Sequence, residues 1–152
     1  MIGNEAAAEV GLDGPGILAR WKAGGHAPGF AGLLGFRIEA FGTGEARLTC
    51  PVGPDHANMM GGVHGGVMAG LADAATGCAL LSMLGVHERF ATTDLQIRYL
   101  KAAPVEAVGA LTITARIVHK GRRMAVADCE IGTGDTVNAR ATASMMITQL
   151  KR

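Results

Sequence analysis

The chain has little charge, few serines and three cysteines, and each shortage excludes a class of protein. With 18% charged residues and a formal net charge of +1, it carries no electrostatic footprint for nucleic acid or for a lipid surface. Ser82 and Ser144 are the only serines, and neither lies in the GxSxG motif of serine hydrolases. The cysteines form no CxxC pair, which excludes a disulfide framework and the usual zinc spacings.

Apolar residues are abundant instead, at 49% of the chain. This composition excludes a disordered chain, and 152 residues are enough for one buried core. So much apolar surface predicts an oligomer. Because no basic start followed by an apolar run marks a signal peptide, and the cysteine pattern fits reduced thiols, we expect a cytoplasmic location.

The longest apolar run covers residues 67–84 and holds a single charged side chain, Asp73. A membrane span is one interpretation, but the run is short and contains two glycines and five alanines. An acid at the centre of a span would cost about 2.5 to 3.5 kcal/mol. We therefore interpret the run as a buried helix and expect no membrane partner.

Helix and strand signals divide the rest of the chain. Asp13 is the expected N-cap of a short helix that has Pro15 in its first turn and ends near Gly24, and residues 28–35 predict another helical turn. Alternating apolar residues predict strands on both sides of the apolar run, the last three forming an antiparallel meander. The expected strand ranges are 36–40, 46–52, 91–101, 107–119, 122–132 and 136–149.

This order of elements predicts an α+β protein. A helix that is apolar on nearly every side needs to be enclosed, because a flat surface would cover only one of its faces. We therefore expect one strongly curved antiparallel sheet around a long central helix.

A glycine-rich turn, HANMMGGVHGG (56–66), leads directly into this helix. No Ser, Thr, Asp or Asn is placed to cap the helix near Gly65, so the first backbone N–H groups should be free for a ligand. At the positive end of the helix dipole such groups can form an oxyanion hole. A simple tight turn is the alternative, while phosphate binding is disfavoured because the GK[ST] ending of a P-loop is absent.

Asp73 follows Gly65 by about two helical turns. A carboxylate in apolar surroundings costs several kcal/mol unless it is paired, and desolvation would make it a stronger base. Since lone buried acids gather at functional sites, we predict a catalytic role. The alternative is a structural acid that is bonded to a neighbouring strand.

Neither a metal site nor a reactive cysteine is expected. His56 and His64 have no third ligand at a suitable spacing, so no metal is expected. Cys78 lies deep in the apolar helix beside no obvious base, which is typical of an inert core thiol.

The runs HANMMGGVHGG (56–66), LAD (71–73) and TTDLQIRYLKAA (92–103) together resemble the hot-dog-fold acyl-CoA thioesterases of the phenylacetate-degradation and hydroxybenzoyl-CoA type. The resemblance covers roughly residues 28–149. It implies a hot-dog domain over residues 28–152 after an N-terminal helical extension over residues 1–27. It also implies a homodimer joined edge to edge, with active sites at the interface, and a homotetramer built from two such dimers.

The activity implied by the resemblance is hydrolysis of an aryl or short- to medium-chain acyl-CoA to the free acid and CoA, without a cofactor. Gly65 matches the backbone N–H that polarises the thioester carbonyl, and Asn58 matches the side chain beside it. Asp73 matches the nucleophile or general base. Thr92 falls where relatives place a hydroxyl residue that helps to orient water or the carboxylate, and His64 matches the motif histidine. Gly65 and Asn58 would come from one subunit, and Asp73 and Thr92 would come from the other.

Further substrate contacts are expected from Gly66 and His56, and a small basic cluster is a candidate for binding the CoA phosphates: Lys120, Arg122 and Arg123. Two other functions stay open. One is hydration or dehydration of an acyl thioester, although His64 and Asp73 are further apart than that chemistry usually requires. The other is binding of acyl-CoA without catalysis.

Overall fold

The computed structural model describes residues 11–25 and 29–150. The helices are α2 (Gly14–Ala23), α3 (Phe30–Leu34), α4 (Gly65–Leu81) and α5 (Val105–Val108), with one 3-10 turn, η1 (Pro54–His56). The strands are β1 (Arg37–Gly42), β2 (Glu45–Pro51), β3 (Glu88–Tyr99), β4 (Ala110–Lys120), β5 (Met124–Thr133) and β6 (Thr136–Gln149).

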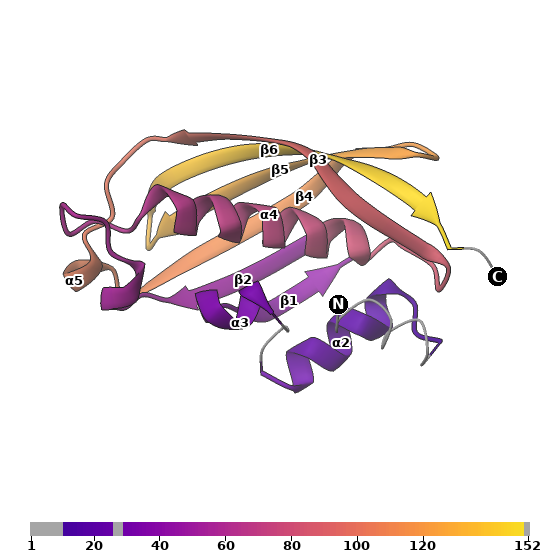
Figure 1. Cartoon of the computed structure of the whole chain (residues 1–152), viewed down its shortest axis with the longest axis horizontal. Coiled ribbons are helices and arrows are strands. Elements are labelled where there is room, and N and C mark those ends of the chain that lie inside the picture. Colours follow the sequence, from indigo (N-terminus) through magenta and orange to yellow (C-terminus); the bar gives the residue numbers. More distant parts are fainter. Residues whose placement is uncertain (1–10, 26–28, 151–152) are drawn as a thin grey trace.

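All six strands form one antiparallel sheet in the order β1-β2-β4-β5-β6-β3. The sheet curves around α4, which lies along its concave side and contacts every strand (Figure 1). The predicted α+β hot-dog arrangement, with a long helix wrapped by a curved sheet, is confirmed. No helix within the described residues combines the length and apolar character needed to cross a bilayer.

Strand boundaries differ from the predicted ones by up to three residues, and the difference at the start of β4 has a clear local cause. The alternating pattern places the start of a strand at residue 107, but residues 105–108 form the short helix α5 and β4 begins at Ala110. Pro104 stands at the N-cap of α5 and Gly109 follows it with φ of 66°, a left-handed conformation that an extended strand does not contain. The local backbone preference therefore overrides the alternation.

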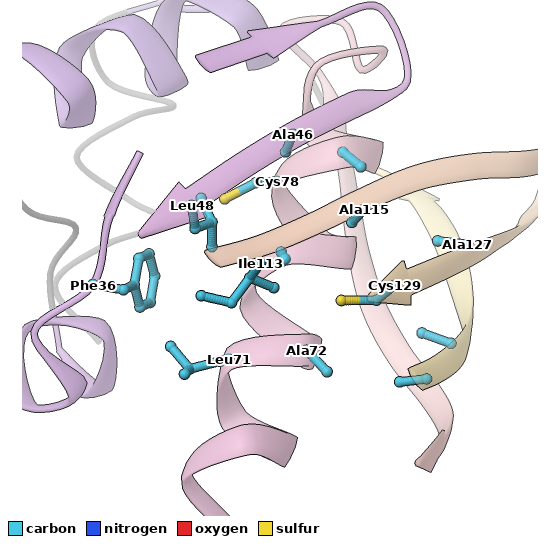
Figure 2. Close-up of a cluster of buried hydrophobic side chains, with 14 of the residues drawn as sticks. Phe36, Ala46, Leu48, Leu71, Ala72, Cys78, Ile113, Ala115, Ala127 and Cys129 are labelled. Atoms are coloured by element: carbon cyan, nitrogen blue, oxygen red, sulfur yellow. The ribbon is translucent and has the colours of Figure 1, made fainter. Parts of the chain in front are cut away.

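The core lies between α4 and the inner face of the sheet. Figure 2 shows Leu71 and Cys78 from the helix packed among side chains of β2, β4 and β5, including Leu48, Ile113 and Cys129. The inner positions of β4, β5 and β6 are apolar and the outer ones are mostly polar, as expected for an antiparallel sheet with one covered face.

All three cysteines are free and buried in this core. Burial raises the pKa of Cys50 to about 11, and that of Cys78 and of Cys129 to about 12. Because the thiolate is the reactive form, these groups are inert at neutral pH, and the prediction of Cys78 as a core thiol is confirmed.

Helix α2 confirms the predicted N-terminal helix. The Asp13 carboxylate accepts a hydrogen bond from the Gly16 N–H at 2.9 Å and so caps its first turn. Ile17 and Leu18 are buried in the same core as the rest of the chain. In Figure 1, α2 lies next to β1, and it contacts both β1 and α4.

The first residue of α2 contacts the backbone at the end of α4 and just after it. Gly14 N–H donates to the Leu84 carbonyl at 2.9 Å, and a Cβ at Gly14 would lie 1.7 Å from the Leu81 carbonyl oxygen. Only glycine fits this contact. Of the predicted N-terminal extension, residues 1–10 and 26–27 lie outside the described residues, and its division from the main domain stays a prediction.

Strand β3 ends the sheet and contains a β-bulge. Thr92 pairs with Met145 and Tyr99 pairs with Ala139, and the register shifts between Thr92 and Asp94. Met145 and Ala139 are buried on the inner face, six residues apart on β6. Their partners are seven residues apart on β3. In a regular strand, two residues at this odd spacing would lie on opposite faces, but the extra residue of the bulge places both on the same face. Thr92 and Tyr99 therefore both face α4.

Alternation also misplaces Asn138, which it assigns to the solvent face of β6. The side chain is 1% exposed. Its Nδ2 donates to the carbonyls of Lys101 and Ala102 at 3.2 and 3.4 Å, and its Oδ1 accepts from the Thr133 hydroxyl at 3.0 Å. A buried amide needs such partners, and here they fix the segment that follows Tyr99.

Candidate active site

The N-terminus of α4 is capped by His64. Its Nδ1 accepts a hydrogen bond from the Gly66 N–H at 2.9 Å, so the neutral ring carries its hydrogen on Nε2. The prediction that no side chain caps this helix is therefore wrong, because histidine was not considered as a cap. The Gly66 N–H is occupied, which does not support the expected substrate contact through it.

Gly65 keeps the free donor that the sequence predicts. Its N–H has no hydrogen-bond partner within the described part of the chain. The other end of the same peptide, the His64 carbonyl, accepts bonds from Val67 N–H at 3.0 Å and Met68 N–H at 3.3 Å. Bonds to that carbonyl polarise the peptide and strengthen its N–H as a donor.

Asp73 is paired with Thr92, as the resemblance implies. The Thr92 hydroxyl donates to Asp73 Oδ1 at 2.7 Å, while Oδ2 has no partner among the described residues. The expectation that Asp73 is buried is wrong for the single chain, where the side chain is exposed. It lies beside β3, the edge strand of the sheet, and no further strand of the described residues extends beyond β3.

The bond to Thr92 also fits the structural alternative, an acid tied to a neighbouring strand. An exposed hydrogen bond of this kind contributes little to stability, however. The core of the chain does not need Asp73 either, since the buried positions of α4 are other residues. The geometry therefore favours the chemical interpretation of Asp73.

Asn58 closes the loop before α4. Its Oδ1 accepts from the Met60 N–H at 2.8 Å and from the Gly62 N–H at 3.1 Å. The amide NH2 end has no partner among the described residues. Asn58 is therefore able to donate to a substrate oxygen while its own oxygen maintains the shape of the loop.

His56 has a structural role. Its Nδ1 accepts from the Gly53 N–H at 3.0 Å, and its Nε2 contacts the Leu34 carbonyl at 3.0 Å. Both ring nitrogens are thus engaged, which ties η1 to the end of α3. The geometry does not support the expected contact between His56 and a substrate.

Tyr99 is a site residue that the sequence did not predict. Its hydroxyl donates to the Gly65 carbonyl at 2.8 Å, and the side chain is 53% exposed. Counting from Thr92 would assign Tyr99 to the opposite face of the strand, because the bulge is not visible in the alternation. No spacing between β3 and the start of α4 could have revealed this contact.

The basic cluster lies at the other end of α4. Lys120, Arg122 and Arg123 are exposed in and beside the turn between β4 and β5. The Gly85 N–H lowers the pKa of Glu88, and the Lys120 ammonium adds to this effect. The cluster therefore lies by the start of β3, whereas Gly65 lies by its end.

The structure brings the predicted residues together in two separate groups. One group joins Gly65 and His64, which contact the unpredicted Tyr99, and the other joins Asp73 and Thr92. Gly65 and Asp73 are about 12 Å apart along the helix axis at 1.5 Å per residue. One carbonyl group cannot contact both within a single chain. Among the described residues, no three His, Cys, Asp or Glu side chains converge as a metal site requires.

A hollow of about 1020 Å³ lies over the outer face of the sheet and contains none of the candidate residues. Its lining is rich in charged pairs, such as Arg140 with Glu130 at 3.0 Å and Arg116 with Asp128 at 3.9 Å. These exposed pairs are typical of a solvated sheet face. The free Gly65 N–H and the Asp73 carboxylate remain the groups with catalytic potential.

Known proteins resemble this chain in sequence and in fold. A protein of Halobacterium salinarum that carries a provisional esterase name is 36% identical over 120 residues, 75% of this chain and 77% of the relative. A hypothetical thioesterase of Streptococcus pneumoniae, solved with coenzyme A, is 28% identical with a TM-score of 0.68, over 77% of this chain and 88% of that one.

The phenylacetic acid degradation protein of Thermus thermophilus, solved as a mutant, shares the fold with a TM-score of 0.70 and 24% identity, over 77% of this chain and 96% of that one. A family model described as the thioesterase superfamily matches residues 60–139, more than half of the chain. That match includes α4 with Gly65 and Asp73, and β3 with Thr92. The chain belongs to the thioesterase superfamily.

Proposed function

We propose that the protein hydrolyses acyl-CoA thioesters to a free acid and CoA, in a site shared by two copies of the chain. The observation that carries the proposal is the Thr92–Asp73 hydrogen bond on an exposed side of α4, where the second carboxylate oxygen has no partner in the part of the chain that the structure describes. The Streptococcus pneumoniae thioesterase was solved with coenzyme A, which supports CoA as the leaving group.

Two features of the chain support a shared site. The separation of Gly65 from Asp73 needs a second chain to bring an oxyanion donor and a carboxylate to one carbonyl. β3 is a twelve-residue edge strand, and a long unpaired edge favours pairing with another copy. Antiparallel pairing of two such strands brings Thr92 of one protomer toward the Gly65 end of its partner. Two dimers would then form the expected homotetramer.

In the proposed reaction, the Gly65 N–H and the Asn58 amide bind the thioester oxygen. Asp73 Oδ2 then has one of two roles. As a base, it takes a proton from water while the water oxygen attacks the carbonyl carbon, the C–S bond breaks and the CoA thiolate takes up a proton. As a nucleophile, it attacks the carbon itself, expels the thiolate and forms an anhydride that water cleaves. Thr92 orients the carboxylate in both cases.

A thioester is electrophilic enough for one carboxylate and an oxyanion hole to suffice. The hydratase alternative has no comparable support, since His64 uses Nδ1 as a helix cap and lies nine residues from Asp73. Binding without catalysis predicts stoichiometric retention of acyl-CoA and no thiol release. A screen of aryl, short-chain and medium-chain acyl-CoAs separates that function from hydrolysis.

Mixing two inactive variants tests the shared site. Asp73→Asn and Gly65→Pro chains, refolded together, should recover about a quarter of wild-type turnover, because half of the dimers are mixed and each contains one intact site. Thiol release measures this recovery. Each variant refolded alone is the control, and a mixture that stays inactive although mixed dimers form would contradict a site made from two chains.

The basic cluster is a candidate for binding the CoA phosphates, and substitution of its arginines tests this role. Changing Arg122 and Arg123 together to alanine should raise KM for acyl-CoA about tenfold with kcat nearly unchanged, the scale of one charge-assisted contact to phosphate. An acyl thioester of N-acetylcysteamine, which has no phosphate groups, should be hydrolysed equally by both proteins. An unchanged KM for acyl-CoA would remove this turn from the site.

A further inference from the structure

We infer that Tyr99 is a positioning residue for the Gly65 N–H. The inference rests on the proposed function and adds to it a side chain from β3 that fixes the direction of the oxyanion donor. Tyr99 acts through the peptide group that joins Gly65 to Gly66, and it need not touch the reacting carbonyl.

The contacts of this peptide leave it little freedom. The Tyr99 hydroxyl holds its carbonyl oxygen at 2.8 Å, and His64 Nδ1 holds its N–H at 2.9 Å. The phenol ring also packs on Gly65, since a Cβ there would lie 3.0 Å from Tyr99 Cζ and 3.1 Å from its hydroxyl oxygen. Glycine is the most flexible residue in the backbone, so an oxyanion donor at Gly65 needs such restraints.

The hydrogen bond is not required by the helix itself. Backbone groups left without partners in the first turn of a helix are N–H groups, whereas the carbonyls there accept helical bonds. The Gly65 carbonyl therefore does not need a further donor for satisfaction. A partly exposed hydroxyl bonded to it adds orientation, and such preorganisation is what an oxyanion donor requires.

Tyr99 is itself held firmly. It pairs with Ala139 on β6, and the next residue, Leu100, donates its N–H to the Asn138 carbonyl at 2.8 Å. The buried Asn138 side chain fixes the two residues that follow. The hydroxyl is thus anchored to the sheet, so the position of Gly65 is set by β3 as well as by α4.

Tyr99→Phe tests the inference because it keeps the ring and removes only the hydroxyl. We expect kcat for the best acyl-CoA of the screen to fall about tenfold with little change in KM, a fraction of the effect of losing an oxyanion donor. Thr142→Val is the matched control, since it removes a hydroxyl that donates to Asp128 at 3.1 Å on the outer face. Its kcat should equal that of the wild type.

Two CoA analogues give a readout that a purely structural role would not change. Trifluoroacetonyl-CoA has a hydrated ketone that mimics the tetrahedral intermediate, and S-propyl-CoA has no carbonyl. Tyr99→Phe should bind the first about tenfold more weakly and the second as tightly as the wild type does, by calorimetry. This ratio is measured within one protein, so a modest loss of stability does not affect it.

The outcomes are distinguishable. An active wild type with unchanged kcat and unchanged analogue ratio in Tyr99→Phe overturns the role of Tyr99 and leaves the proposed function intact. Equal weakening of both analogues also overturns it, because Tyr99 would then bind CoA. A wild type that releases no thiol from any acyl-CoA overturns the proposed function and this role together.

Discussion

Replacing Asp73 with asparagine should lower kcat for acyl-CoA hydrolysis at least about 100-fold, the scale of a general acid–base group. The Thr92 hydroxyl can donate to the asparagine oxygen as it does to Asp73 Oδ1, and the position is exposed in the single chain. The change therefore removes the charge and keeps the geometry. Thiol release detected with a disulfide dye measures the loss, and the buried cysteines keep the background low.

Asp94→Asn is the matched control for this change. Asp94 follows Thr92 by two residues on β3 and pairs with Ser144 on the outer face of the sheet. It is also exposed, so the control removes the same charge from the same strand without touching α4. Wild-type turnover in Asp73→Asn, or an equal loss in both variants, would contradict the proposed chemistry.

Removing the Gly65 N–H should have an effect of similar size. Gly65 is the first residue of α4, a position where proline is well tolerated, and the preceding residue, His64, has the extended conformation that proline favours. Gly65→Pro therefore deletes the donor within an intact helix. Loss of one oxyanion donor typically lowers kcat about 100- to 1000-fold.

Gly65→Ala separates the donor from the contact with Tyr99. Both substitutions introduce a Cβ about 3.0 Å from the Tyr99 ring, but alanine retains the N–H. The ratio of kcat between the alanine and proline variants therefore reports the hydrogen bond itself. We expect the proline variant to be at least about 100-fold slower than the alanine variant. Equal kcat values would show that the Gly65 N–H does not contact the developing oxyanion.

Periodicity was sufficient to predict most of the fold. The six strands alternate clearly, and the run around Leu71 and Cys78 is apolar on so many sides that only an enclosing sheet could cover it. The errors occur where a local interaction overrides the pattern. At α5, Pro104 and Gly109 end the extended conformation. Alternation assigns Asn138 to the solvent face, but its side chain is buried because its amide donates to two backbone carbonyls.

The candidate site was only partly predictable. The Thr92–Asp73 contact followed from a resemblance of motifs, whereas the cap by His64 and the contact of Tyr99 depend on side-chain geometry that a sequence does not display. The predicted burial of Asp73 failed for another reason. Hydrophobic periodicity reports how one chain covers itself, and nothing among the described residues covers the side of α4 that carries Asp73 beside β3.

The surplus residue in β3 makes this strand sensitive to its length. Thr92 and Tyr99 are seven residues apart on β3, whereas their partners on β6 are six residues apart. They face the same side of the sheet only because the bulge adds this one residue to β3. Exchange of a side chain between them leaves this facing unchanged, but deletion or insertion of one residue reverses it. Either the Thr92 hydroxyl beside Asp73 or the Tyr99 hydroxyl bonded to Gly65 would then face outward. In redesign of this protein, the number of residues between Thr92 and Tyr99 therefore matters more than their identity.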